Sequence, residues 1–202
     1  MARPKSFDED KVLDAAVDCF WRNGLNSASI RDLADEMGIA GPSLYNAYGC
    51  KRTLFVQALE RYADMRMRAR LSRLEAELPP KQAILAFFCR TIENSLHDPD
   101  GRGCLLVNSA MDVPRQDEEL TALVADYLDE IKRFFERCLR AGQAAGDIPA
   151  ALDVADMAQL LLAVLFGLRL IARIGPERGR LESAARPVLA LLETKPSTPN
   201  EV

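Results

Sequence analysis

Apolar residues recur along most of this chain at the three- and four-residue spacing of an α-helix. In one short segment Ile30, Leu33, Ala34 and Met37 stand at i, i+3, i+4 and i+7, which places all four side chains on one helical face. The chain has no alternating run of β-branched residues bounded by turn signals, so we predict no strand. The pattern predicts an all-α protein of about nine helices.

Local start and stop signals divide the first fifty residues into three short helices. Ser6 and Ser29 each stand three residues before an acid, and this capping-box spacing predicts a helix start at both positions. Gly24 and Gly38 follow the first two apolar stripes and predict their ends. The Gly-Pro pair at 41–42 predicts the start of a third helix, because proline tolerates the first turn.

The remaining chain predicts six more helices, which are mostly longer. The first of them starts at Lys51 and runs to about Leu78, where two prolines stop it. The other five are expected around residues 84–92, 104–112, 120–139, 153–173 and 181–192. We find no internal repeat and no flexible linker, so the long helix from Lys51 is expected to join two functional halves.

The charge balance differs between these halves. Residues 1–70 hold 11 basic and 10 acidic side chains, a net charge of +1. The whole chain has a net charge of −4, so the remainder carries −5. We therefore expect two domains, at residues 6–66 and 67–195. Any nucleic-acid binding must come from a local surface of the first domain rather than from overall charge.

Cysteine usage and apolar content exclude several classes of protein. The five cysteines are an odd number and widely spaced, and the chain has one histidine, which argues against a disulfide scaffold and a zinc site. No cofactor is predicted. The N-terminus lacks an apolar signal segment, and the most apolar stretch, Leu160–Leu168, is shorter than the ~20 residues of a membrane span. We expect a soluble cytoplasmic protein.

Residues 30–49 have the spacing of a helix-turn-helix. Ala34 is small where two helices must cross closely, and Gly38 stands where the tight turn needs a left-handed backbone. Ile39 and Leu44 are apolar at positions that pack the second helix on the first. The outer side of the second helix then carries small or polar residues: Gly41, Pro42, Ser43, Tyr45, Asn46 and Tyr48.

This outer side suits contact with DNA. Between Gly38 and Val56 the chain has no carboxylate, and its basic residues there are Lys51 and Arg52. Hydroxyls, helix-start amides and lysine can all contact phosphate, and asparagine can pair with an adenine edge. The alternative is a small helical unit that serves packing alone.

The same residues resemble the TetR/AcrR family of transcriptional regulators. The resemblance rests on residues 29–39 and 41–48, completed by 51–55, and extends in sequence over residues 6 to about 66. The nine-helix layout is similar over the whole chain. Two departures concern fine specificity: Ala47 and Tyr48 stand where the family often has histidine and phenylalanine, and Arg52 replaces a common acid.

The resemblance implies a homodimer that binds a palindromic DNA operator, usually as a repressor, and that responds to a small molecule bound in its C-terminal half. It implies DNA contact by position for Ser29, Arg31, Gly41, Pro42, Ser43, Tyr45, Asn46, Tyr48 and Lys51. Arg31 could equally be a solvated helix residue.

The helix expected at 153–173 is apolar on nearly every face, so it should be buried on all sides. A partner subunit is one cover, with a four-helix bundle formed together with the last helix, as the family resemblance also implies. The other is the core of a monomer. For the dimer interface we predict Leu161, Leu165, Leu168, Val188 and Leu192.

Candidates for an effector site come from the inner helices of the C-terminal half, where most apolar residues are ordinary core. They are Phe88, Cys104, Asn108, Met111, Tyr127, Phe135, Phe166 and Arg169. Arg169 interrupts an apolar helix, and a buried cation needs an anionic ligand, an acid of the other subunit, or solvent. Cys104 follows Arg102 near a helix start, and some TetR-like regulators sense electrophiles through cysteines; the alternative is a small buried apolar side chain.

Two other functions compete with a regulator released by a small molecule or electrophile. An enzyme has little support, because the chain has no triad spacing, no glycine-rich phosphate loop and no metal-ligand spacing. A constitutive architectural DNA-binding protein would need only the first third and a strongly basic surface, whereas most of this chain is acidic and apolar.

Overall fold

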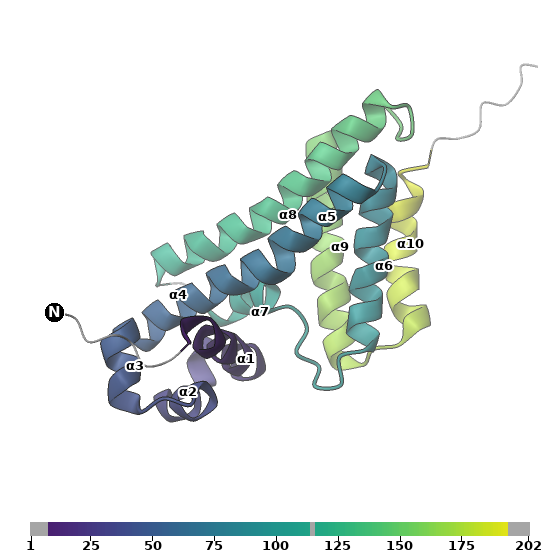
Figure 1. The fold of residues 1–202 in the computed structure, drawn as a ribbon. Coiled ribbons are helices and arrows are strands. Elements are labelled where there is room, and N and C mark those ends of the chain that lie inside the picture. The colour runs from purple at the N-terminus through teal and green to yellow at the C-terminus, as the bar shows by residue number, and fades with distance from the viewer. Residues whose placement is uncertain (1–7, 114–115, 194–202) are drawn as a thin grey trace, which may run out of the picture. The chain divides into compact units, whose positions relative to one another are not determined.

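The computed structural model describes residues 8–113 and 116–193, which form helices and contain no strand (Figure 1). The helical elements are α1 (Glu9–Ser27), α2 (Ile30–Met37), α3 (Gly41–Tyr48), α4 (Lys51–Tyr62), η1 (Ala63–Arg68), α5 (Ala69–Glu77), α6 (Pro80–Leu96), α7 (Leu105–Asp112), α8 (Glu118–Ala144), α9 (Val154–Ile174) and α10 (Arg178–Ala190). If α4, η1 and α5 are counted as one continuous helix, these described residues hold nine helices. The all-α prediction is confirmed.

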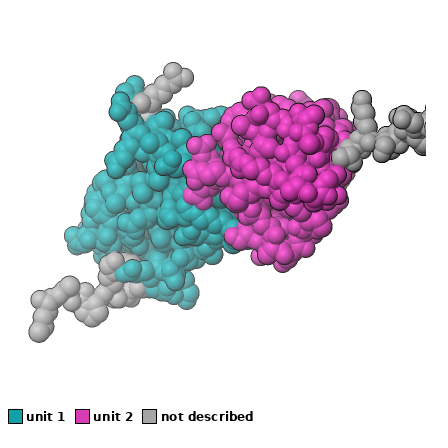
Figure 2. Space-filling model, turned by 90° about the horizontal axis from the view of Figure 1, so that it is seen from above, with its two compact units in different colours: residues 1–70, 102–128 teal, residues 71–101, 129–202 magenta. Residues whose placement is uncertain are grey.

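The chain divides into two compact units, which Figure 2 shows in different colours. Unit 1 comprises residues 1–70 and 102–128, and unit 2 comprises residues 71–101 and 129–202. The domain bounds expected from the sequence, 6–66 and 67–195, stay a prediction. Unit 1 also includes α7, which packs on α1 and α4. The chain passes between the units three times: within α5, in the segment between α6 and α7, and within α8.

Local capping forms the start of α2 as predicted. The Ser29 hydroxyl accepts from the Asp32 amide at 3.1 Å, and the Asp32 carboxylate accepts from the Ser29 amide at 3.0 Å. Gly38 ends α2 in the left-handed region, with φ +64°. The predicted cap Ser6 lies outside the described residues, and α1 begins at Glu9 behind Asp8.

Gly24 interrupts α1 near its end instead of standing just past it. Its φ of +75° and ψ of +169° are not helical, and the chain makes one more turn before Ser27. A Cβ atom at this position would clash with the Asp112 carboxylate of α7. The neighbouring Asn26 side chain donates to the Asp112 carbonyl at 2.7 Å. Glycine therefore allows both the backbone turn and the close approach of α7.

The long helix predicted from Lys51 is continuous through α4, η1 and α5, and it ends before Pro79 as expected. Its middle is a π-helix, Ala63–Arg68, which the apolar spacing did not predict. Ion pairs flank this wider turn, because the Arg68 guanidinium lies 2.7 Å from Glu60 and 2.6 Å from Asp64.

The core of unit 2 is built on α6, α9 and α10, which lie side by side (Figure 1). Four phenylalanines of α6 and α8 form its aromatic centre: Phe87, Phe88, Phe134 and Phe135. Their ring centroids lie between 5.1 and 5.8 Å apart, and all four side chains are buried. Edge-on and offset ring contacts of this kind favour a well-packed core.

Helix α9 is buried in the single protomer on one side only, so the alternative of a helix enclosed in a monomer core is wrong. One face packs in unit 2, but Leu160, Leu170 and Ile174 are 42%, 53% and 72% exposed. The apolar stretch is also longer than expected, since 21 residues form one helix with a mean hydropathy of 1.9 over its most apolar 18 residues. By length and composition alone it could cross a membrane; its buried leucines serve the core of unit 2.

Candidate nucleic-acid interface and effector site

The outer face of α3 is polar and open to solvent. Pro42, Ser43, Tyr45 and Asn46 are exposed, and the Tyr45 side chain keeps 51% of its surface. Gly41 is half-buried at the helix start. These five predicted DNA contacts therefore lie together on one helix of eight residues.

Tyr48 is a correction to the predicted outer face. Its side chain is 6% exposed and lies in the core of unit 1. The reason is helical spacing, because Tyr48 follows Leu44 by four residues and shares its inward face. The resemblance placed Tyr48 on the DNA side by position, but a buried ring has no surface to offer a duplex.

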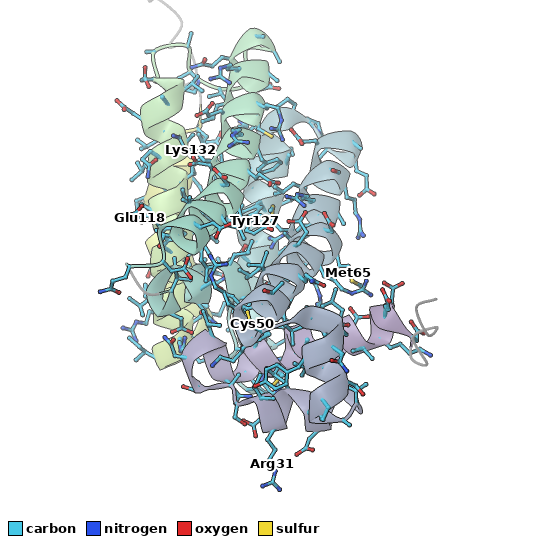
Figure 3. All side chains as sticks on the ribbon, turned by 90° about the vertical axis from the view of Figure 1, so that its left-hand side faces the viewer. Arg31, Cys50, Met65, Glu118, Tyr127 and Lys132 are labelled. Carbon is cyan, nitrogen blue, oxygen red and sulfur yellow. The ribbon has the colours of Figure 1, made fainter. Side chains whose placement is uncertain are left out.

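The two predicted contacts on α2 are exposed but differ in how they are held. The Ser29 hydroxyl donates to the Asp32 carboxylate at 2.6 Å, and this hydrogen bond lowers the pKa of Asp32. The Arg31 side chain is 90% exposed, 3.7 Å from Asp35, and extends away from its helix (Figure 3). Arg31 is thus free to reorient, whereas Ser29 is fixed by the cap.

Lys51 is half-buried and already used within the protein. Its ammonium donates to the carbonyls of Ala28 at 3.0 Å and Asn26 at 3.4 Å. These bonds attach the start of α4 to the segment between α1 and α2. Contact of Lys51 with phosphate stays a prediction, and the structure adds a positioning role.

Arg52 forms an ion-pair network that the sequence did not predict. Its guanidinium binds the Asp117 carboxylate through two nitrogens, at 2.6 and 2.8 Å, and the Glu119 carboxylate at 2.8 Å. The Arg52 hydrogen bonds lower the pKa of Asp117 to about 2. Because the partners are more than 60 residues apart, no local pattern could have revealed them. The replacement of a common acid by Arg52 was the available signal.

Cys50 stands immediately before α4 and is exposed. Its sulfur lies 3.2 Å from the Thr53 hydroxyl, and this hydrogen bond lowers the pKa of the Cys50 thiol. A lowered pKa raises the fraction of reactive thiolate, so this exposed cysteine beside the polar face of α3 reacts more readily with electrophiles.

Cys104 lies at the start of α7 in unit 1 and is half-buried. The Tyr62 hydroxyl donates to its sulfur at 3.7 Å. The Arg102 guanidinium lies over the Trp21 ring, 4.4 Å from the centroid, and the Trp21 nitrogen donates to the Arg102 carbonyl at 3.1 Å. Arg102 is therefore stacked on Trp21.

Of the three further effector candidates of unit 1, Asn108 and Tyr127 have structural contacts and Met111 is exposed. The Asn108 amide donates to the Arg102 carbonyl at 2.7 Å, whereas Met111 is 61% exposed. Tyr127 is buried, its hydroxyl donates to the Glu60 carboxylate, and Arg68 lies 5.5 Å from its ring centroid. Tyr127 thus joins α8 to the long helix within unit 1.

The four other candidates belong to unit 2. Phe88 and Phe135 are fully buried in the aromatic centre. Phe166 and Arg169 are half-buried on α9, and Arg169 donates to the Ser95 hydroxyl at 3.3 Å. The eight candidates are therefore divided equally between the two units.

A groove of about 840 Å³ lies between α6 and α10 in unit 2. Its lining is Leu78, Gln82, Leu85, Ala86, Phe88, Cys89, Arg90, Ile92, Glu182, Ala185, Arg186, Leu189, Ala190 and Glu193. Phe88 is the one predicted effector residue among them. The sequence could not indicate this groove, because its two walls are about a hundred residues apart.

The five residues predicted for the dimer interface lie in the protomer's own interior. Leu161, Leu165, Leu168, Val188 and Leu192 are between 0% and 5% exposed. Such side chains offer a second subunit almost no surface. The exposed apolar residues of the same C-terminal segment are instead Leu160, Leu170, Ile174 and Leu191, and we move the predicted interface to them.

Comparison with known proteins supports both halves of the fold. The family described as bacterial regulatory proteins, tetR family, matches residues 12–58, and the tetracyclin repressor-like C-terminal domain matches residues 80–188. The chain is 31% identical over 195 residues to the uncharacterized HTH-type transcriptional regulator YezE of Bacillus subtilis (strain 168), covering 96% of this chain and 100% of that protein. It is 29% identical over 190 residues to the HTH-type transcriptional repressor ComR of Escherichia coli (strain K12), covering 94% and 90%.

A solved structure gives the same result. A cysteine mutant of the TetR family transcriptional regulator CifR, complexed with 26-bp double-strand operator DNA, has a TM-score of 0.83 and 32% sequence identity, covering 93% of this chain and 98% of that one. These named relatives are transcriptional regulators. Because the two family matches cover both halves and the alignments span nearly the whole length, the chain belongs to the TetR family of helix-turn-helix transcriptional regulators.

Proposed function

We propose that this cytoplasmic protein binds a palindromic DNA operator as a homodimer, represses transcription there, and is released by an effector bound in its C-terminal half. In this proposal residues 6–66 bind DNA and residues 67–195 bind the effector and dimerise. The relative ComR is a repressor, and the structure of a CifR cysteine mutant is a complex with operator DNA.

The observation that carries the proposal is the outer face of α3. Ser43, Tyr45 and Asn46 are exposed on it, and the sequence from Gly38 to Val56 has no carboxylate. An acid-free polar helix can enter the major groove without repelling phosphate. In this role Tyr45 contacts the backbone, and Ser43 and Asn46 read base edges.

Dimerisation follows from the exposed apolar stripe of α9. Leu160, Leu170 and Ile174 lie on one face and give a second subunit an apolar surface to cover. A two-fold arrangement that pairs these helices would present two copies of α3. To enter successive major grooves, the two copies must stand about 34–36 Å apart.

Release requires that effector binding change this spacing. Residues 51–77 form one continuous helical segment that starts beside α3 and continues into unit 2 from Leu71. An effector that favours a different tilt of this segment would separate the two recognition helices. A switch from 99% bound to 99% released needs about 5.5 kcal/mol of differential affinity.

Selection of duplexes from a random library, followed by fluorescence anisotropy on the best one, tests DNA binding by the full chain. Tyr45→Ala and Lys51→Ala should weaken binding to all duplexes alike, whereas Ser43→Ala and Asn46→Ala should change the preferred bases. Met65→Ala is the matched control, since Met65 is 55% exposed on η1 and away from α3 (Figure 3). Full affinity in both Tyr45→Ala and Lys51→Ala would refute the interface.

The trigger of release is tested separately. If Cys104 responds to electrophiles, iodoacetamide should release wild-type protein from the selected duplex, and Cys104→Ser should remain bound with unchanged basal affinity. Full release of the Cys104→Ser protein would exclude the thiol and leave non-covalent induction. A protein that binds DNA but ignores every small molecule tried would instead be a constitutive architectural protein.

A further inference from the structure

Arg169 lies on the buried side of α9. At 3.6 residues per turn it stands roughly 140° around the helix from the exposed stripe that ends at Ile174. It shares its side with Leu162 and Leu165, which are 5% and 3% exposed. The contact with Ser95 of α6 agrees with this direction, since the Ser95 side chain is itself buried. The guanidinium therefore faces the interior of unit 2.

The guanidinium has far fewer partners than it has donors. Among the residues that the structure describes, its one hydrogen bond runs from Nη1 to the Ser95 hydroxyl at 3.3 Å, and its Nε is buried without a partner. No described carboxylate pairs with it. Glu93, a nearby acid of α6, binds Arg178 through both oxygens, at 2.5 and 3.0 Å. A half-buried cation held against a neutral hydroxyl is costly unless an anion joins it.

The face of α6 beside Arg169 changes from polar to apolar within three turns. The Ser95 hydroxyl donates to the Thr91 carbonyl at 2.9 Å, and the Thr91 hydroxyl donates to the Phe87 carbonyl at 2.8 Å. Phe87 then opens the aromatic centre, with its ring 5.1 Å from that of Phe135. The Arg169 cation and the hydroxyls of Ser95 and Thr91 thus lie at one end of this face, and the aromatic rings lie at the other.

We propose that Arg169 binds the carboxylate of a monoanionic effector whose remaining body is apolar. The inference rests on the proposed function, because it names the chemical class of the effector. Two N–H groups of the fork can bind one carboxylate side on, while the Ser95 hydroxyl, whose proton is donated to the Thr91 carbonyl, accepts from the guanidinium and positions it. A single cation matches one negative charge, and Phe166, half-buried one turn before Arg169 on α9, offers apolar surface to the rest of the effector.

A partner subunit is a poorer source of the anion. The apolar stripe that would meet a second α9 points away from Arg169, so an acid across that interface would have to reach around the helix. Arg173, one turn further along α9, is exposed and also positively charged. It repels the Arg169 guanidinium and therefore does not supply the missing negative charge.

The test uses the full-length protein and two matched probe pairs: sodium benzoate with benzyl alcohol, and sodium octanoate with 1-octanol. Thermal unfolding is followed at constant ionic strength, with sodium chloride as the balancing salt. At least one carboxylate should raise the Tm of the wild-type protein more than its alcohol does. Arg169→Gln should weaken that carboxylate at least tenfold by isothermal titration, whereas the control Arg173→Gln should bind as the wild type does.

A measurement without any probe guards against a merely unfolded variant. Arg169→Met removes the unpaired cation, so its ligand-free Tm should equal or exceed that of the wild-type protein. The proposal is overturned if neither carboxylate raises the wild-type Tm, if the alcohols act equally, or if Arg169→Gln retains the effect. A fall in Tm or dimer mass on Arg169→Met would show a structural ion pair instead.

The proposed function can fail independently of this inference. If the protein binds no duplex but still binds a carboxylate through Arg169, the operator function is refuted and the anion site stands. DNA release by a neutral compound alone would refute the anion site and leave the operator function.

Discussion

Helices α3 and α9 both expose one face, but the two faces are chemically opposite. The exposed side chains of α3 include Ser43, Tyr45 and Asn46, which can exchange hydrogen bonds with water or with a ligand. Those of α9 include Leu170 and Ile174, whose side chains form no hydrogen bonds with water or with a ligand. A polar face can stay in water between binding events, whereas an apolar face of this length favours permanent cover. The contrast indicates reversible contact at α3 and lasting contact at α9.

The cations near the two helices also differ in whether they have carboxylate partners. Two cations near the helix-turn-helix of unit 1 have acids of their own: Arg22 lies 2.5 Å from Glu36, and Arg61 binds Asp14 at 2.6 Å. On α9 the inward Arg169 has only a hydroxyl. These two ion pairs form within unit 1 itself, whereas α9 of unit 2 exposes apolar side chains and holds Arg169 without a carboxylate among the described residues.

The largest expected effect tests which face of α9 is core. Leu165→Glu places a charge at a position that is 3% exposed, so it should destabilise the protomer by about 4 kcal/mol or more and unfold it. Leu170→Glu, at 53% exposure, should preserve the circular dichroism spectrum but reduce the mass by light scattering from about twice 22.4 kDa to that value.

The control for this pair is Ala155→Glu, an exposed position of α9 away from the apolar stripe. It should change neither fold nor mass. A dimer that survives charges at both Leu170 and Ile174 would place the interface elsewhere and remove the contrast between α3 and α9.

The second effect tests the two glycines that shape unit 1. Both have positive φ, but a Cβ at Gly38 meets open space, whereas at Gly24 it meets the Asp112 carboxylate. Gly38→Ala should therefore cost about 1 kcal/mol of unfolding free energy, from backbone strain alone. Gly24→Ala should cost clearly more, because α7 must also move. Equal losses in urea unfolding would show that α7 is not held closely at this point.

These glycines also show what the sequence could predict. Gly38 and the Ser29 cap act within four residues, so local rules identified the start and end of α2 correctly. The role of Gly24 depends on Asp112, 88 positions later, and could not be read from its neighbours. A sequence pattern can predict interactions between residues a few positions apart, but it does not predict which distant residues lie close together in the fold.

The same distinction explains the errors in the candidate sites. Leu161 and Leu165 were correctly identified as apolar positions of one helix, but apolarity alone does not distinguish a protomer's core from its interface. Tyr48 was assigned to the outer face by position, although its spacing from Leu44 already predicted burial. Arg169 was singled out because a cation in an apolar helix is locally conspicuous, which needs no knowledge of its partner.

A smaller effect compares the paired cation of unit 1 with the unpaired one of unit 2. Arg52 lowers the pKa of Asp117 from 3.8 to about 2, so the pair stabilises the fold above pH 3.8 and loses this effect as the pH falls towards 2. The Tm difference between wild-type protein and Arg52→Gln should be constant from pH 7 to 5 and shrink below pH 4. Arg169→Gln should show no such titration, since no described carboxylate pairs with Arg169. A pH-independent Arg52→Gln difference would mean that the ion pair does not form in solution.

The smallest effect concerns thiols in the two units. Cys50 of unit 1 is exposed, and its hydrogen bond with Thr53 lowers its pKa; Cys138 of unit 2 is buried, and desolvation raises its pKa to about 12. Because the thiolate is the nucleophile, iodoacetamide at pH 7.5 should modify Cys50 quickly and Cys138 only on unfolding, as measured by peptide mass spectrometry. Thr53→Val should slow the reaction of Cys50 several-fold and leave that of the exposed Cys89 unchanged.

The selected DNA duplex links this thiol to the polar face of α3. Cys50 stands two residues after the end of α3, so a duplex seated on that face should protect it from iodoacetamide while Cys89, in unit 2, reacts at its usual rate. Protection lost in Tyr45→Ala would connect the two through the same surface. Equal labelling of Cys50 with and without duplex would place the DNA away from the start of α4. The assignment of reversible contact to α3 and lasting contact to α9 would then be wrong.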